Sequence, residues 1–129
     1  MGALNNIIVM NRGDSYEFDL TIADEASVNG RYRLCGDDAV YFGLMDPGQP
    51  FELALVRKKY TAEDTDEQGN LVIKLEPDDT LDLFPGKYFY AIKLHLNHPD
   101  IDSNTGLTTG EHIDKVVTVI NKTKFIICD

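Results

Sequence analysis

The sequence predicts an all-β domain, and three observations lead to this prediction. Apolar and polar residues alternate with a period of two along many short segments. Turn residues separate these segments at intervals of roughly 8 to 12 residues, which is typical of sandwiches and barrels. No long segment keeps the 3.6-residue period of a helix. Because the segments vary in length and one loop (97–111) is long, we predict an antiparallel, Ig-like β-sandwich of eight or nine strands, formed by a single domain, residues 1–129.

Nine segments have strand character. In chain order they are residues 5–10, 15–22, 31–35, 39–45, 51–60, 70–76, 87–96, 112–120 and 124–128. Glycine-containing turns lie between several of them, at Arg12-Gly13-Asp14, Asn29-Gly30, Gly36-Asp37-Asp38, Asp46-Pro47-Gly48 and Gln68-Gly69-Asn70. Asn29-Gly30 is the strongest hairpin signal, because a type I′ turn needs positive φ at both central residues.

Residues 69–96 specify a piece of sheet most completely. Leu71, Ile73 and Leu75 alternate with polar or exposed positions and predict a strand with one buried face. The segment 77–83 is too short for a full helix and begins with proline, so we expect one helical turn there. After the Pro85-Gly86 turn, one face of the next strand carries Tyr88, Tyr90, Ile92, Leu94 and Leu96.

Composition limits the classes of partner. A net charge of −10 argues against nucleic acid and against anionic membranes, because both are bound by clustered lysine and arginine. The one basic cluster, Arg57-Lys58-Lys59, is typical of a solvated strand face or a protected sheet edge. The N-terminus has no basic segment and no long apolar run, so we expect no signal peptide. Cys35 and Cys128 are then expected to be free thiols, with a disulfide as the alternative.

Enzyme chemistry finds little support in the sequence. The nucleophile-elbow and zinc-protease motifs are missing, and adjacent acids such as Asp37-Asp38 point to opposite faces of a strand. His95, His98 and His112 would suit zinc by type, but His95 and His98 differ in strand parity. We therefore expect a protein that is not an enzyme and has no required cofactor.

Two ligand sites are weighed against simpler explanations. Asp100, Asp102, Asn104 and Glu111 have the spacing of calcium ligands 1, 3, 5 and 12 of an EF-hand loop, although Thr105 replaces the usual glycine. The simpler explanation is a solvated hairpin loop. Tyr41, Tyr60, Tyr88 and Tyr90 would stack on sugar rings if they shared one exposed face, but strand aromatics more often pack in a core.

The order of elements is more informative than any one motif. It runs from GDSYEFDLTI and GDDAVYFGLM through GNLVIKLEPDDT to LFPGKYFYAIKL, and ends in KVVTVI and KFII. This order resembles the small β-sandwich domains of tailed phages and prophages, and is most similar to the N-terminal domain of baseplate upper proteins. Ala91 follows Tyr88-Phe89-Tyr90 at a position where that family usually has aspartate.

The resemblance implies a non-enzymatic structural subunit of a phage or prophage tail or baseplate. Its partners would be other tail subunits, including further copies of itself, and it would be found in the virion after synthesis in the host cytoplasm. The expected docking edges are residues 5–10 and 51–60. The alternative is a ligand-binding sandwich, either a carbohydrate-binding module or a weak calcium-binding adhesin module.

Overall fold

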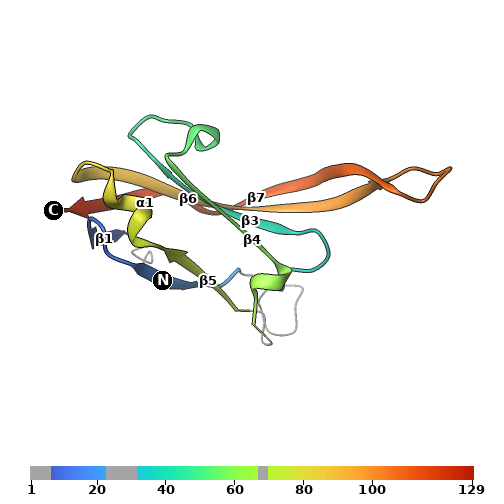
Figure 1. Ribbon diagram of the computed structural model, residues 1–129, viewed down its shortest axis with the longest axis horizontal. Coiled ribbons are helices and arrows are strands. Elements are labelled where there is room, and N and C mark those ends of the chain that lie inside the picture. Colours follow the sequence, from blue (N-terminus) through green and yellow to red (C-terminus); the bar gives the residue numbers. More distant parts are fainter. Residues whose placement is uncertain (1–6, 23–31, 67–69) are drawn as a thin grey trace.

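A computed structural model describes residues 7–22, 32–66 and 70–129, which form two β-sheets (Figure 1). The larger, sheet A, has five strands in the order β1-β7-β6-β3-β4, and the smaller, sheet B, pairs β2 with β5. The strands are β1 (Ile8–Asn11), β2 (Tyr16–Leu20), β3 (Ala39–Met45), β4 (Val56–Thr61), β5 (Leu71–Leu75), β6 (Gly86–Ile101) and β7 (Thr108–Cys128). The prediction of an all-β chain is thereby confirmed.

Sheet A is mixed rather than purely antiparallel, which corrects the prediction. Strand β1 runs parallel to β7, with Ile8 beside Phe125 and Asn11 beside Cys128. The other pairs in sheet A, and the β2–β5 pair, are antiparallel. Because β1 and β7 lie at the two ends of the chain, no tight hairpin joins them and either direction is open to them. Just beyond β1, Arg12 forms an ion pair with Asp129 at 2.9 Å.

The described residues contain seven strands, fewer than the predicted eight or nine. Residues 32–35 of the predicted strand 31–35 are irregular, and residue 31 lies outside the described part. The predicted strand 51–60 begins with a 3₁₀ turn, η1 (Phe51–Leu53), because Pro50 lacks the amide hydrogen that would continue a ladder. The predicted strands 112–120 and 124–128 are one continuous strand, β7, in which bulges replace the expected turn. The Asn29-Gly30 hairpin lies outside the described residues.

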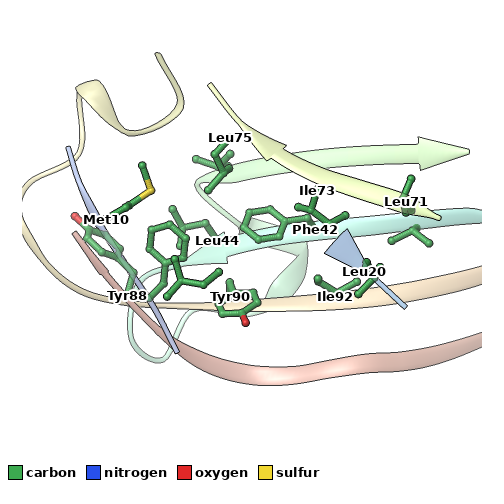
Figure 2. Close-up of a cluster of buried hydrophobic side chains, with 14 of the residues drawn as sticks. Met10, Leu20, Phe42, Leu44, Leu71, Ile73, Leu75, Tyr88, Tyr90 and Ile92 are labelled. Atoms are coloured by element: carbon green, nitrogen blue, oxygen red, sulfur yellow. The ribbon is translucent and has the colours of Figure 1, made fainter. Parts of the chain in front are cut away.

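The core lies between the two sheets, and the predicted faces supply it. Leu71, Ile73 and Leu75 of β5 are buried, and Val72 and Lys74 between them are exposed. Figure 2 shows side chains of β5 meeting those of β3 and β6. Sheet A contributes Val40, Phe42, Leu44, Tyr88, Tyr90, Ile92 and Leu94, all buried.

Aromatic rings hold the centre of this core together. Phe42 stacks on Tyr90 with ring centroids 5.7 Å apart, and Phe125 meets Tyr90 edge to face at 6.1 Å. Each such pair contributes about 0.5–1.5 kcal/mol beyond the burial of its area. The three rings join β3, β6 and β7 across sheet A.

One helical turn, α1 (Pro77–Leu81), follows β5 and confirms the prediction for this segment. Pro77 stands at the first turn, where its missing amide hydrogen is not needed, and Asp79 Oδ2 accepts a hydrogen bond from Glu76 N at 2.7 Å. The buried Thr80 accepts a hydrogen bond from Gly13 N at 2.9 Å. Asp79 also pairs with Lys58 of β4 at 2.8 Å. The turn α1 is thus fastened both to the β1–β2 connection and to sheet A.

The prediction of a long loop over residues 97–111 is wrong. Strand β6 continues to Ile101 and β7 begins at Thr108, so most of this segment is strand. Beyond the pair between Ala39 and His95, β6 has lost its neighbour β3, and β6 and β7 alone form a projecting two-stranded ribbon (Figure 1). We call residues 96–116 the arm. Pro99 and the surrounding polar residues suggested a loop, but a strand with one free edge tolerates a proline.

Candidate interaction surface

The outer face of sheet A, which points away from sheet B, is built from alternate residues of four strands. Tyr41 of β3 is flanked by Lys59 of β4 and Lys93 of β6, so these three side chains share the face. The same registers bring Arg57 beside Gly43, and Lys124 beside Phe89. We call the basic residues of this surface the basic face: Arg57, Lys59, Lys87, Lys93, Lys122 and Lys124.

Aromatic rings underlie three of these cations. Lys93 Nζ is 4.9 Å from the ring centroid of Phe51, and Lys59 Nζ is 5.9 Å from that of Tyr41. Lys87 is placed in the same way over Phe89, at 5.9 Å. A cation over a ring is attracted by about 0.5–1 kcal/mol at an exposed site. The lysine stems cover apolar surface and keep their ammonium groups at fixed places on the face.

No residue of the basic face has a carboxylate partner in the described part of the chain. The ion pairs there join Arg12 to Asp129, Lys58 to Asp79, Lys74 to Glu76 and His98 to Asp114. Lys122 Nζ instead donates a hydrogen bond to the carbonyl oxygen of Gln49 at 2.8 Å. Six of the chain's 12 basic residues therefore gather on one face, where Glu52 is near Lys93 and Lys122, and Glu63 and Glu111 are near Lys59, without forming ion pairs.

A shallow hollow of about 230 Å³ lies within the basic face. Its apolar floor includes Phe51 and Ala91, and Lys93 and Lys122 stand at its rim together with Glu52. An apolar floor with cations at the rim suits an acidic side chain, whose methylene groups lie on the floor and whose carboxylate meets an ammonium group.

Sheet B and α1 form the opposite side of the molecule, and this side is acidic. Glu17 and Asp19 alternate with the inward-facing Tyr16, Phe18 and Leu20, so they point away from the core. We call the exposed carboxylates of β2, α1 and the adjoining turns the acidic side: Asp14, Glu17, Asp19, Glu76, Asp78 and Asp82. Lys74 also lies on this side, as the cross-strand partner of Glu17 and in an ion pair with Glu76 at 3.6 Å, so the excess of carboxylates there is reduced by this lysine.

The structure divides the predicted calcium ligands. Asp102 and Asn104 lie in the turn at the tip of the arm, where Asp102 Oδ1 accepts a hydrogen bond from Asn104 N at 2.9 Å. Asp100 is paired with Gly110, whereas Glu111 is paired with Pro99, so these two carboxylates point to opposite faces of the arm. Among the described residues, no group of three or more histidine, cysteine or acidic side chains is placed to hold a metal ion. Calcium binding by this set stays a prediction.

The three histidines lie on two different faces of the strands, as the opposite parity of His95 and His98 predicted. His98 and His112 are cross-strand neighbours with ring centroids 5.1 Å apart, and His98 Nδ1 lies 2.7 Å from Asp114 Oδ2. That hydrogen bond raises the pKa of His98. His95 lies on the other face, with its ring tilted against that of Tyr41 at a centroid distance of 4.6 Å, and its partial burial lowers its pKa.

The four candidate sugar-binding tyrosines do not form one platform. Tyr88 and Tyr90 are buried in the core. Tyr60 is paired with Val40 and Tyr41 with Lys59, which places the two remaining rings on opposite faces of sheet A. The core-packing explanation is confirmed for Tyr88 and Tyr90.

Both segments that were expected to act as docking edges overlap an edge strand of sheet A. Within 5–10 and 51–60, the structure places β1 and β4, which are the two outer strands of sheet A. The basic face was missed from the sequence because its members are spread from residue 57 to residue 124. The alternation of Lys87 and Lys93 with buried residues was the available signal, but only the strand order brings the other lysines beside them.

No family model matches the chain, and neither a curated protein nor a solved structure gives a significant match. Within residues 7–22, 32–66 and 70–129, no helix is long and apolar enough to cross a membrane.

Proposed function

We propose that this chain is a non-enzymatic structural subunit of a phage or prophage tail or baseplate, in which it acts as a docking module. We further propose that its two sheets are a divergent β-sandwich of the Ig-like type. The observation that carries the docking role is the arm, a ribbon that extends beyond the core (Figure 1). Several of its apolar side chains are exposed to solvent.

The apolar row lies on one face of the arm. This face carries the pairs His95–Val116, Asn97–Ile113, Pro99–Glu111 and Ile101–Thr108, so Glu111 stands among its apolar side chains. Val116, Ile113 and Ile101 are 48%, 51% and 54% exposed. The opposite face carries Asp100, His98 and His112, with Asp114 bonded to His98. A two-stranded ribbon has little stability of its own in water, and an exposed apolar row is typical of an interaction site.

Free strand edges add a second means of assembly. Within the described residues, strands β1 and β4 each have one neighbour in sheet A, so each is an edge strand of that sheet. A neighbouring subunit that supplies an extended segment would pair with such an edge. The arm and the edges together suit a subunit held by several neighbours.

The tail or baseplate setting rests on the resemblance of the element order to phage baseplate domains. The partners in this proposal are other tail subunits and further copies of the chain.

Immunogold microscopy tests this function on phage-like particles induced from a host that carries the gene. We expect label at the tail tip or baseplate. An arm variant, Ile101→Asn with Ile113→Asn, should lose the label, whereas a control on the opposite face, Asp100→Asn with His112→Asn, should keep it. Particles without label for the wild-type chain would overturn the proposal.

A further inference from the structure

We propose that the basic face of one copy binds the acidic side of a second copy, so that the chain associates head to tail. This inference rests on the proposed structural function and names the partner of one surface. It depends on the described residues of sheet A, sheet B and α1, and it does not involve the arm.

The basic face fits an acidic protein surface better than a nucleic acid. Single-stranded nucleic acids stack their bases on exposed aromatic rings. Here the rings of Phe51, Tyr41 and Phe89 are each covered by a lysine of the same face. A carboxylate-bearing protein surface needs only the ammonium groups and the hollow between Lys93 and Lys122.

The chain itself supplies such a surface at a matching spacing. Glu17 and Asp19 are two residues apart on β2, and Arg57 and Lys59 are two residues apart on β4. A strand rises about 3.3 Å per residue, so both pairs place their charges roughly 6.6 Å apart. The turn α1 adds the exposed Asp78 and Asp82 to the acidic side. Spacing and sign are thus complementary on the two sides of one molecule.

The position of the two surfaces determines the type of assembly. Because they lie on opposite sides of the core, a contact between them leaves one basic face and one acidic side free. Such a heterologous contact generates a ring where the rotation closes and a filament where it does not. A ring or stack of identical subunits agrees with a role in a tail.

Sedimentation velocity across a range of protein concentrations tests the inference at low and high salt. We expect association at about 20 mM salt that weakens at least tenfold in the dissociation constant at about 500 mM, where charges are screened within a few ångströms. Arg57→Glu with Lys59→Glu, and separately Glu17→Lys with Asp19→Lys, should each abolish association. A control with the same change in charge as the first, Arg33→Glu with Lys115→Glu, lies outside both surfaces and should retain it.

Mixing the two charge-reversed variants is the sharpest test. One variant then has acids at positions 17, 19, 57 and 59 and the other has bases at all four, so neither should associate alone through these pairs, and the mixture should form alternating complexes. Circular dichroism of each variant checks folding, and the neutral pairs Arg57→Gln with Lys59→Gln and Glu17→Gln with Asp19→Gln replace a variant that fails to fold.

Three results would overturn the inference: a wild-type chain that stays monomeric at low salt, a control that loses association equally, or a folded mixture that does not associate. Tighter binding of a single-stranded oligonucleotide than of a second copy would also overturn it. Immunogold label on particles combined with monomeric behaviour in solution would reject only this inference and leave the proposed function standing.

Discussion

Lys93 Nζ lies 4.9 Å from the ring centroid of Phe51, and this contact joins the centre of the basic face to the 3₁₀ turn that crosses it. Phe51 is buried at 8% exposure in a small cluster with Met45 and Ala91, on the outer side of sheet A. The turn η1 reaches the sheet at Gly43. A Cβ atom at Gly43 would lie 2.8 Å from Phe51 Cε2 and 3.2 Å from Ala54 Cβ. The basic face therefore depends on a glycine in the middle of β3.

We predict that Gly43→Ala destabilises the protein by about 1–3 kcal/mol, because the added methyl group must displace Phe51 from a packed position. Urea unfolding followed by circular dichroism measures the change. The same experiment on Gly110→Ala is the control, since a Cβ there meets only Asp100 Oδ2, at 3.9 Å. Equal stability of Gly43→Ala and the wild type would show that Phe51 is not held against β3.

Stability should fall in alkali as the pH rises above 10. Burial raises the pKa of Tyr90 to about 12, and burial also raises the pKa of Tyr88. The unfolded chain releases these protons first, near pH 10, so unfolding becomes easier between the two values. A single tyrosine contributes a slope of up to about 1.4 kcal/mol per pH unit.

The variant Tyr90→Phe tests this pH dependence. We expect its unfolding free energy to decline less steeply than that of the wild type between about pH 10 and pH 12. Urea titrations at several alkaline pH values give the two slopes. A variant with the wild-type slope would show that Tyr90 is not the group responsible.

Much of the fold could be predicted, because a strand that is buried on one face has apolar residues at every second position. Alternation assigned Ile73 to a buried face, and core packing was the preferred explanation for Tyr90; both residues are buried. Strand pairing is different, because it depends on contacts between distant segments. The parallel pair of β1 and β7 left no local signal, and bulges hid the continuity of β7 at Asn121 and Lys122.

The candidate surface was harder to predict than the core. Arg57 and Lys59 were recognised as a cluster because they are adjacent in sequence, but Lys93 and Lys124 join them only through the order β7-β6-β3-β4. The calcium hypothesis did not predict the arm, because it too relied on spacing along the sequence. Sequence spacing resembled a compact loop, and cross-strand pairing separates Asp100 from Glu111.

The arm should add little to the stability of the core. Replacing residues 98–112 with Asn-Gly would join Asn97 to Ile113 through a two-residue hairpin turn. We expect the unfolding free energy to change by less than about 1 kcal/mol, because the removed residues are exposed and lie beyond β3. Urea unfolding measures this, with Leu94→Ala in the buried part of β6 as the contrast, at about 2–5 kcal/mol. A large loss on trimming would mean that the arm packs against the core.

Two histidines of β6 should titrate on opposite sides of the ordinary value. The hydrogen bond that His98 donates to Asp114 raises the pKa of His98, and partial burial lowers that of His95. Near pH 6.5 we therefore expect His98 to be mostly protonated and His95 mostly neutral. The contribution of His98 to stability is present below pH 6.5 and is lost as the pH rises through its folded value, whereas that of His95 is lost as the pH falls.

Nuclear magnetic resonance of the histidine ring carbons between about pH 4 and pH 9 reads both titrations separately. In Asp114→Asn the midpoint of His98 should move down because the charged acceptor 2.7 Å away is gone, and the midpoint of His95 should stay where it is. His95 serves as the internal control because it lies on the other face of the strand. A His98 midpoint that is the same in both proteins would mean that the ion pair across the arm is not formed in solution, and that the bulge at Asp114 does not hold the carboxylate against the ring.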